Sequence, residues 1–250
     1  ALASGLGYRA FRDEHASVLT RLRARPILRR IRWSCPPWRG AGRYLDVGCG
    51  SGAALGVARE LGWQVSGIEM DDAAAAMARR FSDEVYIGDI LSAPIGPGRF
   101  DVVTAFHVLE HVPDPVAVAR RMLDWLAPGG LLIVEVPNAG GLGASFFGRA
   151  WSGLELPRHL SHFTPATLET VVRKAGGRVV WSRHQAKPRT YLWSLSALLR
   201  DRGWNRLAGV GESRAVYGVL KLGLEVLLPL VRLARRGEAI RVGAVRNLPV

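Results

Sequence analysis

Apolar residues follow two alternating patterns along most of the chain. Short continuous apolar runs, which are typical of buried strands, cover residues 43–47, 64–68, 84–87, 100–105, 131–136, 178–184 and 239–245. Between most of these runs the apolar positions recur at helical spacing, over residues 53–61, 71–81, 115–127 and 165–175. Continuous apolar strands alternating with helices indicate a parallel sheet covered on both faces. We therefore expect an α/β fold with a doubly wound, Rossmann-like sheet that binds ligands at the carboxyl ends of its strands.

Three segments interrupt this alternation. Residues 8–31 have an arginine-rich helical pattern with an expected break at Pro26, and residues 137–163 form a long connection that we expect to cover the site. Residues 188–237 are predicted to be a helical insert. The expected organisation is a basic helical segment at 1–39, a ligand-binding core at 40–187, the insert at 188–237 and the last core strand within 238–250.

Composition and charge narrow the function classes. The 250 residues are 48% hydrophobic and 22% charged, which excludes a wholly disordered chain. Cys35 and Cys49 are too few for a disulfide scaffold, which favours a reducing, cytoplasmic location. The net charge of +13 is concentrated at the two ends, since residues 1–43 and 187–250 each carry +8. Such basic ends suit an anionic membrane surface or a phosphorylated substrate, and no stretch is apolar enough to predict a membrane-spanning helix.

A glycine-rich turn follows the first predicted strand, in the sequence LDVGCGSG at residues 45–52. Glycines at such a turn let the backbone approach a ligand and adopt positive φ. Gly48, Gly50 and Ala53 also satisfy the dinucleotide-binding fingerprint, so a nicotinamide-dependent oxidoreductase is an alternative. Asp46 argues against it, because a carboxylate beside the turn repels a pyrophosphate and favours a ligand that carries an ammonium or a sulfonium.

Acidic residues also follow the next two predicted strands. Glu69 is placed to accept both hydroxyls of a ribose, and Asp89 is placed to bind an exocyclic amine such as that of adenine. Each acid alone can be explained as a helix cap or a turn residue. Three acids at three consecutive strand ends indicate a ligand that contains adenosine.

The sequence resembles the class I S-adenosylmethionine-dependent methyltransferases over residues 40–186. The resemblance is carried by LDVGCGSG at 45–52, GIEMD at 67–71, GDI at 88–90, FDVVTAFHVLEHVPDP at 100–115 and LAPGGLLIVEVPN at 126–138. It implies a seven-stranded, mostly parallel sheet whose last strand, here residues 239–245, is antiparallel. It also implies S-adenosyl-L-methionine as the cofactor.

The same resemblance implies a set of cofactor contacts. Asp46, Gly48 and Gly50 would contact the methionine part of the cofactor. Glu69 would contact the ribose, and Asp89 the adenine amine. The complete predicted cofactor site is Asp46, Gly48, Cys49, Gly50, Gly52, Glu69, Met70, Asp89, Ile90, Phe106 and His107, of which the last two flank the cofactor.

Methyl transfer to a hydroxyl requires alignment, exclusion of water and a base that takes the proton. The predicted catalytic bases are His111, His159 and His162, which lie in the region that borders the expected pocket. The segment Leu156–Pro165, which contains two of them, resembles the histidine-rich pocket segment of a subfamily that includes small-molecule O-methyltransferases. A purely structural role for these histidines, as supports near a helix start at Thr164, is the alternative.

A metal site is a further alternative around residues 107–111. If these residues form a helical turn, His107 and His111 share one face with Glu110 beside them. The fragment HVLEHVPDP looks like the stretch of ubiquinone-pathway O-methyltransferases in which a Glu-x-x-Glu-His cluster is associated with a divalent cation. His107 replaces the first Glu of that cluster, and imidazole prefers transition metals to Mg²⁺. We therefore predict no metal ligand, with Glu110 and His111 as a polar pocket wall.

The insert has a narrow charged stripe and a broad apolar face. At 100° per residue the stripe consists of Arg214, Lys221, Glu225, Arg232 and Arg236. Pro229 is expected to kink or divide this helix. The apolar face either packs on the domain or on a second subunit, or lies in a membrane surface with Trp193 and Trp204 at the interface.

The sequence thus predicts a methyltransferase that acts on the hydroxyl of a small molecule, with lipid-linked molecules and sugars among the candidate acceptors. N-methylation of an amino sugar or another small amine, and binding of an adenosyl ligand without catalysis, stay open. No nucleic-acid partner is predicted, since neither an Asn-Pro-Pro-Tyr-type motif nor an RNA-binding domain is present. A homodimer and a peripheral membrane contact are both compatible with the sequence.

Overall fold

The computed structural model describes residues 42–82, 84–204 and 214–247, and among these the side chains of residues 214–217 and Lys221 are not described. The predicted arginine-rich helix at 8–31, its break at Pro26 and Cys35 lie outside the described residues. The chain forms two compact units. The first contains the described residues up to Ala105 together with Asp124–Ile133, and the second contains Phe106–Leu123 and the residues from Val134 onward.

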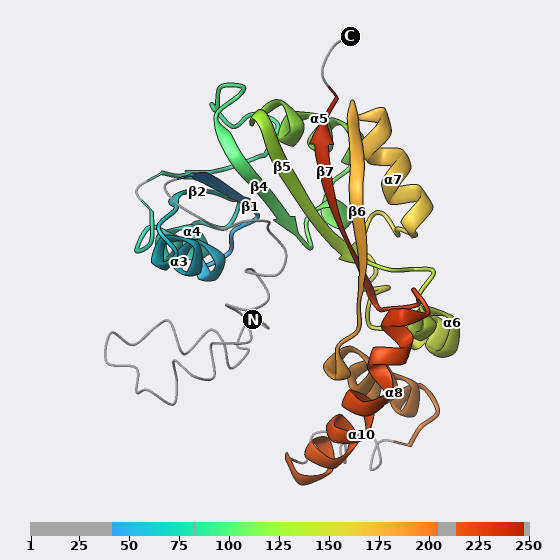
Figure 1. Ribbon diagram of the computed structural model, residues 1–250. Coiled ribbons are helices and arrows are strands. Elements are labelled where there is room, and N and C mark those ends of the chain that lie inside the picture. The colour runs from blue at the N-terminus through green and yellow to red at the C-terminus, as the bar shows by residue number, and fades with distance from the viewer. Residues whose placement is uncertain (1–41, 83, 205–213, 248–250) are drawn as a thin grey trace. The chain divides into compact units, whose positions relative to one another are not determined.

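Seven strands form one sheet, as expected (Figure 1). The strands are β1 (Arg43–Val47), β2 (Gln64–Glu69), β3 (Val85–Ile87), β4 (Phe100–Phe106), β5 (Leu126–Pro137), β6 (Gly177–Gln185) and β7 (Ala239–Arg246). Their order in the sheet is β3-β2-β1-β4-β5-β7-β6. β1 pairs in parallel with β2 and β4, whereas β7 pairs antiparallel with β6. The predicted Rossmann-like sheet with an antiparallel last strand is therefore confirmed.

The first unit supports the glycine-rich turn. Its helices are α3 (Ala53–Glu60) and α4 (Asp72–Ala78), and both contact β2. In the sheet, Asp46 is the register partner of Gly67 on one side and of Thr104 on the other. The core of this unit contains fully buried Tyr44, Leu45 and Leu55.

The helix predicted at 115–127 ends earlier than expected. The helix α5 covers Pro115–Asp124, and β5 begins two residues later at Leu126. The reason is that the carbonyl of Trp125 accepts hydrogen bonds from the N–H groups of Arg99 and Phe100, while its fully buried indole donates to the carbonyl of Ile95. Pairing with the start of β4 therefore outweighs the helical spacing.

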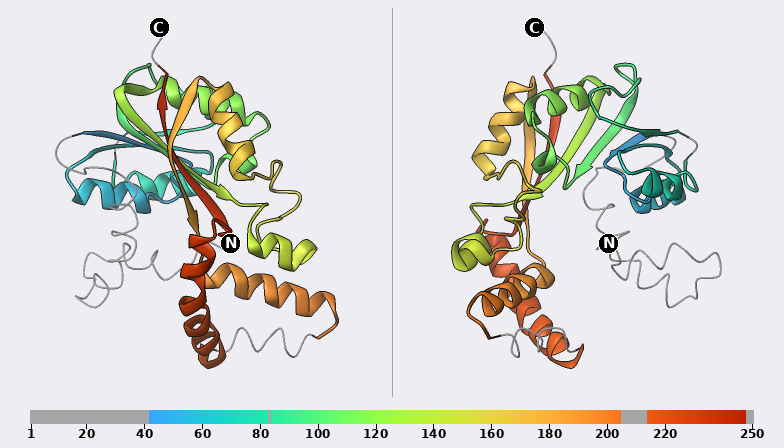
Figure 2. Two further views of the ribbon diagram at one scale, coloured as in Figure 1. Left: turned by 45° about the vertical axis from the view of Figure 1, so that its right-hand side comes forward. Right: turned by 180° about the vertical axis from the view of Figure 1, so that it is seen from behind.

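The second unit contains two groups of helices on β6 and β7. The helix α7 (Pro165–Lys174), capped by the Thr164 side chain, packs on β6. The connection predicted to be long contains α6 (Leu142–Phe147), and the insert forms α8 (Pro188–Asp201) and α10 (Arg214–Leu233). Figures 1 and 2 show α6, α8 and α10 gathered where β6 ends and β7 begins.

The helix α10 runs through Pro229 as one element, so the expected division of the helix is wrong. Its Leu228 joins a buried cluster with Phe147, Trp151 and Tyr191. Beside this cluster the buried carboxylate of Glu238 accepts hydrogen bonds from the Trp151 indole and a backbone amide. Within the described ranges, no helix has a stretch long and apolar enough to cross a membrane.

Candidate functional sites

The glycine-rich turn after β1 has the backbone that its sequence predicts. Gly48, Gly50 and Gly52 all have positive φ, at 68°, 54° and 83°. The N–H groups of Gly48 and Cys49 both donate to the carbonyl of Ile68, which fixes the turn to β2. A Cβ on Gly50 would meet no atom within 4 Å, so this part of the turn is open to a ligand.

Glu69, at the end of β2, holds the same turn. Its Oε2 accepts the N–H of Gly50 at 2.7 Å, and its Oε1 accepts the N–H groups of Met70 and Asp71 at 2.8 and 3.0 Å. A carboxylate offers about four lone-pair sites, so these three bonds leave one site, on Oε2 of Glu69, for a hydroxyl of a ribose. Glu69 thus orders the turn besides its predicted role as a ligand contact.

Asp46 is a buried carboxyl, with 4% of its surface exposed. Its Oδ1 accepts a hydrogen bond of 2.6 Å from the Thr104 hydroxyl, which is itself 2.7 Å from the hydroxyl of Tyr44. Burial raises the pKa of Asp46 to about 7; the bond from Thr104 opposes this rise, and the nearby Glu69 adds to it. Asp46 therefore lacks a cationic neighbour among the described residues and would be stabilised in its ionised form by a positively charged ligand.

The remaining predicted cofactor residues of the first unit lie in different environments. Cys49 is buried with its Sγ against Gly67, and burial raises the pKa of its thiol well above the usual range, so only its backbone can serve a ligand. Met70 is 70% exposed and Ile90 is buried. The Oδ1 of exposed Asp89 accepts the N–H of Leu91, which orders the turn after β3.

S-adenosyl-L-methionine fits the donor and acceptor groups of this unit. Burial is the main cause of the raised pKa of Asp46, and the nearby carboxylate of Glu69 adds to it, so the two carboxylates interact unfavourably. A ligand with an ammonium group would relieve that repulsion, whereas a pyrophosphate would increase it. Asp46, Gly48 and Gly50 would hold the methionine part, and Glu69 and Asp89 the adenosine.

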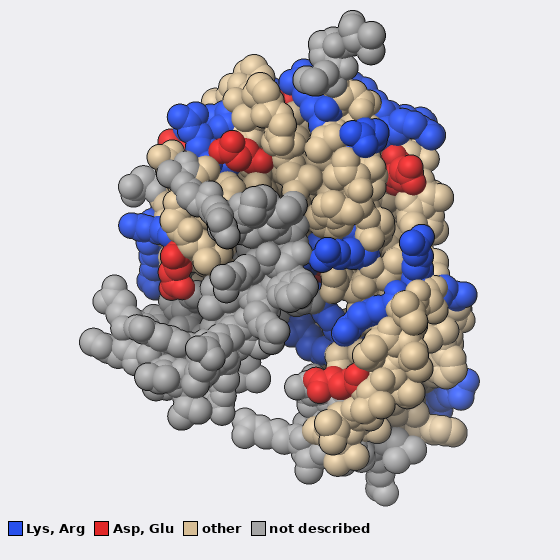
Figure 3. Space-filling view, viewed as in Figure 1, with Lys and Arg blue, Asp and Glu red and all other residues tan. Residues whose placement is uncertain are grey.

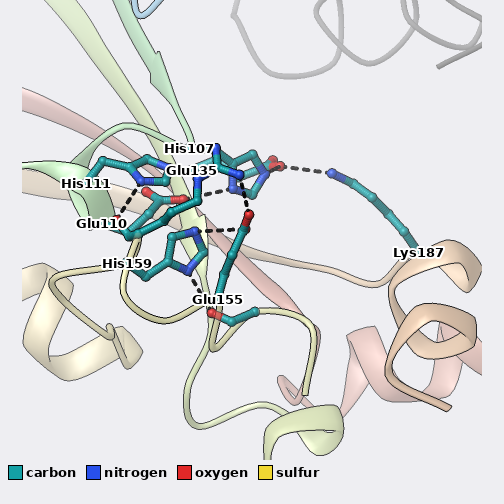
Figure 4. Close-up of polar contacts among 9 residues, drawn as sticks. His107, Glu110, His111, Glu135, Glu155, His159 and Lys187 are labelled. Carbon is teal, nitrogen blue, oxygen red and sulfur yellow. Dashed lines mark hydrogen bonds and ion pairs between the residues drawn. The ribbon is translucent and has the colours of Figure 1, made fainter. Parts of the chain in front are cut away.

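His107 does not belong to a helical turn with His111, which was the condition for placing the two rings on one face. It has a left-handed φ of 59°, and a short 3-10 helix, η1, starts only at Leu109 and ends at His111. The His107 ring lies between two buried carboxylates, with Nδ1 3.1 Å from Glu110 and Nε2 3.3 Å from Glu135 (Figure 4). Desolvation lowers the pKa of His107, but the two carboxylates outweigh it and raise the pKa to about 9. His107 is therefore an imidazolium at neutral pH, which excludes it as a base or a metal ligand in this state.

Glu135 connects three cationic side chains of the second unit. Its Oε2 accepts a hydrogen bond of 2.7 Å from Nε of buried Arg241. Its Oε1 accepts one of 3.1 Å from Nζ of Lys187 (Figure 4). The guanidinium of Arg241 also lies 4.9 Å from the ring centroid of Phe106. One face of Phe106, predicted to flank the cofactor, is therefore covered by Arg241.

The three predicted bases lie close together but differ in their free nitrogen atoms. His111 has its Nδ1 3.0 Å from the carbonyl of Arg158, and its ring packs on that of His159 with the centroids 4.8 Å apart. His159 is buried, and both of its nitrogens have partners, the carbonyl of Gly153 and the carboxylate of Glu155. Among the described residues, these contacts leave Nε2 of His111 without a hydrogen-bond partner.

His162 lies at the edge of this group. It is exposed, its Nε2 is 2.9 Å from the carbonyl of Leu154, and its ring centroid is 6.2 Å from that of His159. The connection that carries His159 and His162 is fixed by the carbonyl of Glu110, which accepts the N–H groups of Leu160 and Ser161. The structure therefore brings His111, His159 and His162 together without a shared helix.

Glu110, His111 and His159 form a group able to hold a metal ion, with one ligand atom of each lying within 4.8 Å of the others. The Oε2 of Glu110 is buried and has no hydrogen-bond partner among the described residues. Two imidazoles and one carboxylate suit a transition metal better than Mg²⁺. A metal on Nε2 of His159 would have to displace Glu155 from that atom. The group includes His159 in place of the expected His107.

Several residues of these sites were missed by the sequence analysis. Thr104, Glu135 and Arg241 each interrupt an otherwise apolar strand. A polar or charged residue inside a buried strand needs a partner, so this interruption was an available signal. Lys187 and Glu155 lie in loops and carry no such signal.

Comparison with known proteins agrees with this geometry. A family model described as a methyltransferase domain matches residues 8–181. A ubiquinone biosynthesis O-methyltransferase of Xanthomonas euvesicatoria is 34% identical over 148 residues, which cover 54% of this chain and 62% of that protein. One from Bordetella pertussis is 32% identical over 169 residues, covering 62% of this chain and 70% of that protein. The chain therefore spans less than two thirds of the Xanthomonas relative.

Solved structures share the fold at lower identity. The [4+2]-cyclase SpnF has a TM-score of 0.59 at 23% identity, covering 95% of this chain and 85% of that one. The phosphoethanolamine N-methyltransferase 2 of Haemonchus contortus, in complex with S-adenosyl-L-methionine, has a TM-score of 0.56 at 21% identity. The match covers 90% of this chain and 53% of that one. With the family match over most of its length, the chain belongs to the methyltransferase domain family, among the class I S-adenosylmethionine-dependent methyltransferases.

Proposed function

We propose that the protein transfers the methyl group of S-adenosyl-L-methionine to a hydroxyl of a small-molecule acceptor, with His111 as the general base. The observation that carries the proposal is the hydrogen bond between Nδ1 of His111 and the carbonyl of Arg158, at 3.0 Å. The printed names of the curated relatives, ubiquinone biosynthesis O-methyltransferases, support a hydroxyl acceptor.

The hydrogen bond determines which nitrogen of His111 is basic. A carbonyl only accepts, so Nδ1 must carry the proton, and the neutral ring then has its lone pair on Nε2. S-adenosyl-L-methionine, when bound, supplies an electrophilic methyl group and a thioether that leaves without a proton. The only proton to be removed is that of the acceptor hydroxyl, and Nε2 of His111 is suited to take it.

The neighbouring histidines are less suited to this role. His107 is already protonated at neutral pH between its two carboxylates. His159 uses both nitrogens, and His162 has its free nitrogen on an exposed ring. His159 instead supports His111 through ring packing.

The test is methyl transfer by the purified full chain with a His111→Asn variant. The Asn amide can still donate to the carbonyl of Arg158, but it offers no group in place of Nε2. With S-adenosyl-L-methionine carrying a tritiated methyl group and catechol as the hydroxyl acceptor, we expect kcat to fall on the order of 10²- to 10⁴-fold. The affinity for S-adenosylhomocysteine should not change.

The matched control is His162→Gln, in which the amide preserves the donor to the carbonyl of Leu154. This variant should keep kcat within about threefold of the wild type. Full activity of His111→Asn would refute the role of His111. Labelling of an amino sugar such as glucosamine, with none of catechol, would refute O-methylation and support the amine acceptor instead.

A further inference from the structure

The helix α10 exposes a broad apolar surface, which we name the α10 arc. Its members are 39% to 83% exposed and are Val219, Leu220, Leu222, Val226, Leu227, Leu230 and Leu233. At 100° per residue they span about 160° of the helix circumference. Isolated exposed apolar residues need no explanation, but a contiguous patch of this kind marks an interaction site.

The side of α10 that adjoins the arc at Leu220 already serves the core of the second unit. Leu224, Leu228 and Val231 pack into the cluster that contains Phe147, Trp151 and Tyr191. The helix is therefore apolar on two sides, and only one of them is buried by the described residues. The packing of the monomer explains Leu228, which is 1% exposed, but it does not explain the α10 arc.

The charge around the arc indicates the kind of partner. Residues 188–237 contain nine Lys and Arg residues but only three Asp and Glu residues. In Figure 3 the surface where α8 and α10 lie is mostly tan, with blue side chains along its edges and red ones at its left margin. An apolar surface with basic margins fits a partner that is apolar inside and anionic at its surface.

Two tryptophans on or beside α8 favour the same kind of partner. Trp193 and Trp204 are 50% and 53% exposed, and the guanidinium of Arg189 lies 4.0 Å from the Trp193 ring centroid. Tryptophan is enriched where a membrane meets water, because its ring is apolar and its N–H is polar. A second copy of the chain fits less well, since it would bring two equally basic inserts together.

We propose that the α10 arc lies in the interfacial layer of a bilayer that contains anionic lipids. In this arrangement Leu222, Val226 and Leu230 enter the boundary between headgroups and acyl chains, and the basic residues of the insert remain among the headgroups. The helix lies on the membrane, since it is not apolar enough to span it.

The test is co-sedimentation of the full chain with vesicles of phosphatidylcholine alone and of phosphatidylcholine with phosphatidylglycerol. We expect binding to the anionic vesicles that weakens as the salt concentration rises. A Val226→Glu, Leu230→Glu variant should bind on the order of 10- to 100-fold more weakly. Val180→Glu, which changes a residue of β6 that is 41% exposed, should bind as the wild type does.

Two further measurements separate the possible outcomes. Circular dichroism and thermal unfolding verify that the double Glu variant is folded, and a milder Val226→Ser, Leu230→Ser variant replaces it if it is not. Equal sedimentation with the two vesicle types, or undiminished binding by both double variants, would overturn the proposal. The proposal would also be overturned if the wild-type protein formed a dimer that does not bind vesicles and the double variant were a monomer. The arc would then bind a second copy of the chain.

Discussion

The carboxyl of Asp46 lies in a buried environment that disfavours its ionised form. Burial raises its pKa to about 7, and the hydroxyl of Thr104 offsets only part of that cost. Groups arranged to receive a charged ligand commonly reduce stability in the free protein. His107 shows the reverse case, in which the buried carboxylates of Glu110 and Glu135 keep a ring that is 45% exposed protonated. Both charges are set by neighbours and not by the residue alone.

Asp46→Asn tests this reading through stability. The pKa of Asp46 is higher in the folded protein than its ordinary value of 3.8, so protonation stabilises the fold. That stabilisation is complete below about pH 4 and is lost as the pH rises through about 7. The wild-type Tm should therefore decrease between about pH 5 and about pH 8 more than the Tm of Asp46→Asn, which keeps the bond to Thr104. Parallel curves for the two proteins would contradict the raised pKa.

The acids of the predicted cofactor site could be selected from the sequence more readily than their neighbours. Asp46, Glu69 and Asp89 stand out because each lies at or just beyond the end of a strand that the apolar pattern locates. The contacts of His107 could not be predicted, since Glu135 is 28 residues away on β5 and no sequence signal marks the left-handed backbone of His107. The helical turn at 107–111 that the metal alternative assumed does not form.

At the scale of elements, the turn between β1 and α3 combines a rigid part with an open one. Gly52, at φ 83°, would place a Cβ 2.8 Å from the Cα of Ala78 in α4. Gly50, at φ 54°, would place its Cβ in open space. Gly52 is therefore required for packing of the two helices, and Gly50 for access to the turn.

The two glycines should respond differently to alanine. Gly52→Ala combines left-handed strain with a clash against backbone atoms, so it should lower stability by about 2–4 kcal/mol in thermal or urea unfolding. Gly50→Ala should cost only about 1–2 kcal/mol, but its methyl group projects where the ligand is expected and should weaken S-adenosylhomocysteine binding at least tenfold. The reverse ranking, with Gly50→Ala the less stable variant, would contradict this division.

The ends of the helices were predictable where a local sequence signal marks them, and not where they depend on contacts with distant residues. The helix predicted at 165–175 was nearly correct, because Thr164-Pro165 is a strong start signal and α7 begins there. The helix predicted at 115–127 was too long, because the end of α5 is set by the contacts of Trp125 with the start of β4 and with Ile95.

At the scale of the whole molecule, the order of apolar runs was sufficient for the class of fold. Strands and helices alternate so regularly that one sheet topology explains them, and β7 follows the insert as expected. The surroundings of the predicted bases could not be predicted from the order of apolar runs. They depend on residues 137–163, in which the carbonyls of Gly153, Leu154 and Arg158 pair with ring nitrogens of His159, His162 and His111.

The central claim is that the turn after β1 holds a cationic adenosyl ligand beside Asp46. Calorimetric titration of the purified chain with S-adenosylhomocysteine and with NADH tests it most directly. We expect saturable binding of S-adenosylhomocysteine that strengthens as the pH rises through about 7, when Asp46 loses its proton. Binding should be on the order of 10- to 100-fold weaker in Asp46→Asn, and NADH should give no binding heat. Tight binding of NADH, with none of S-adenosylhomocysteine, would contradict the account.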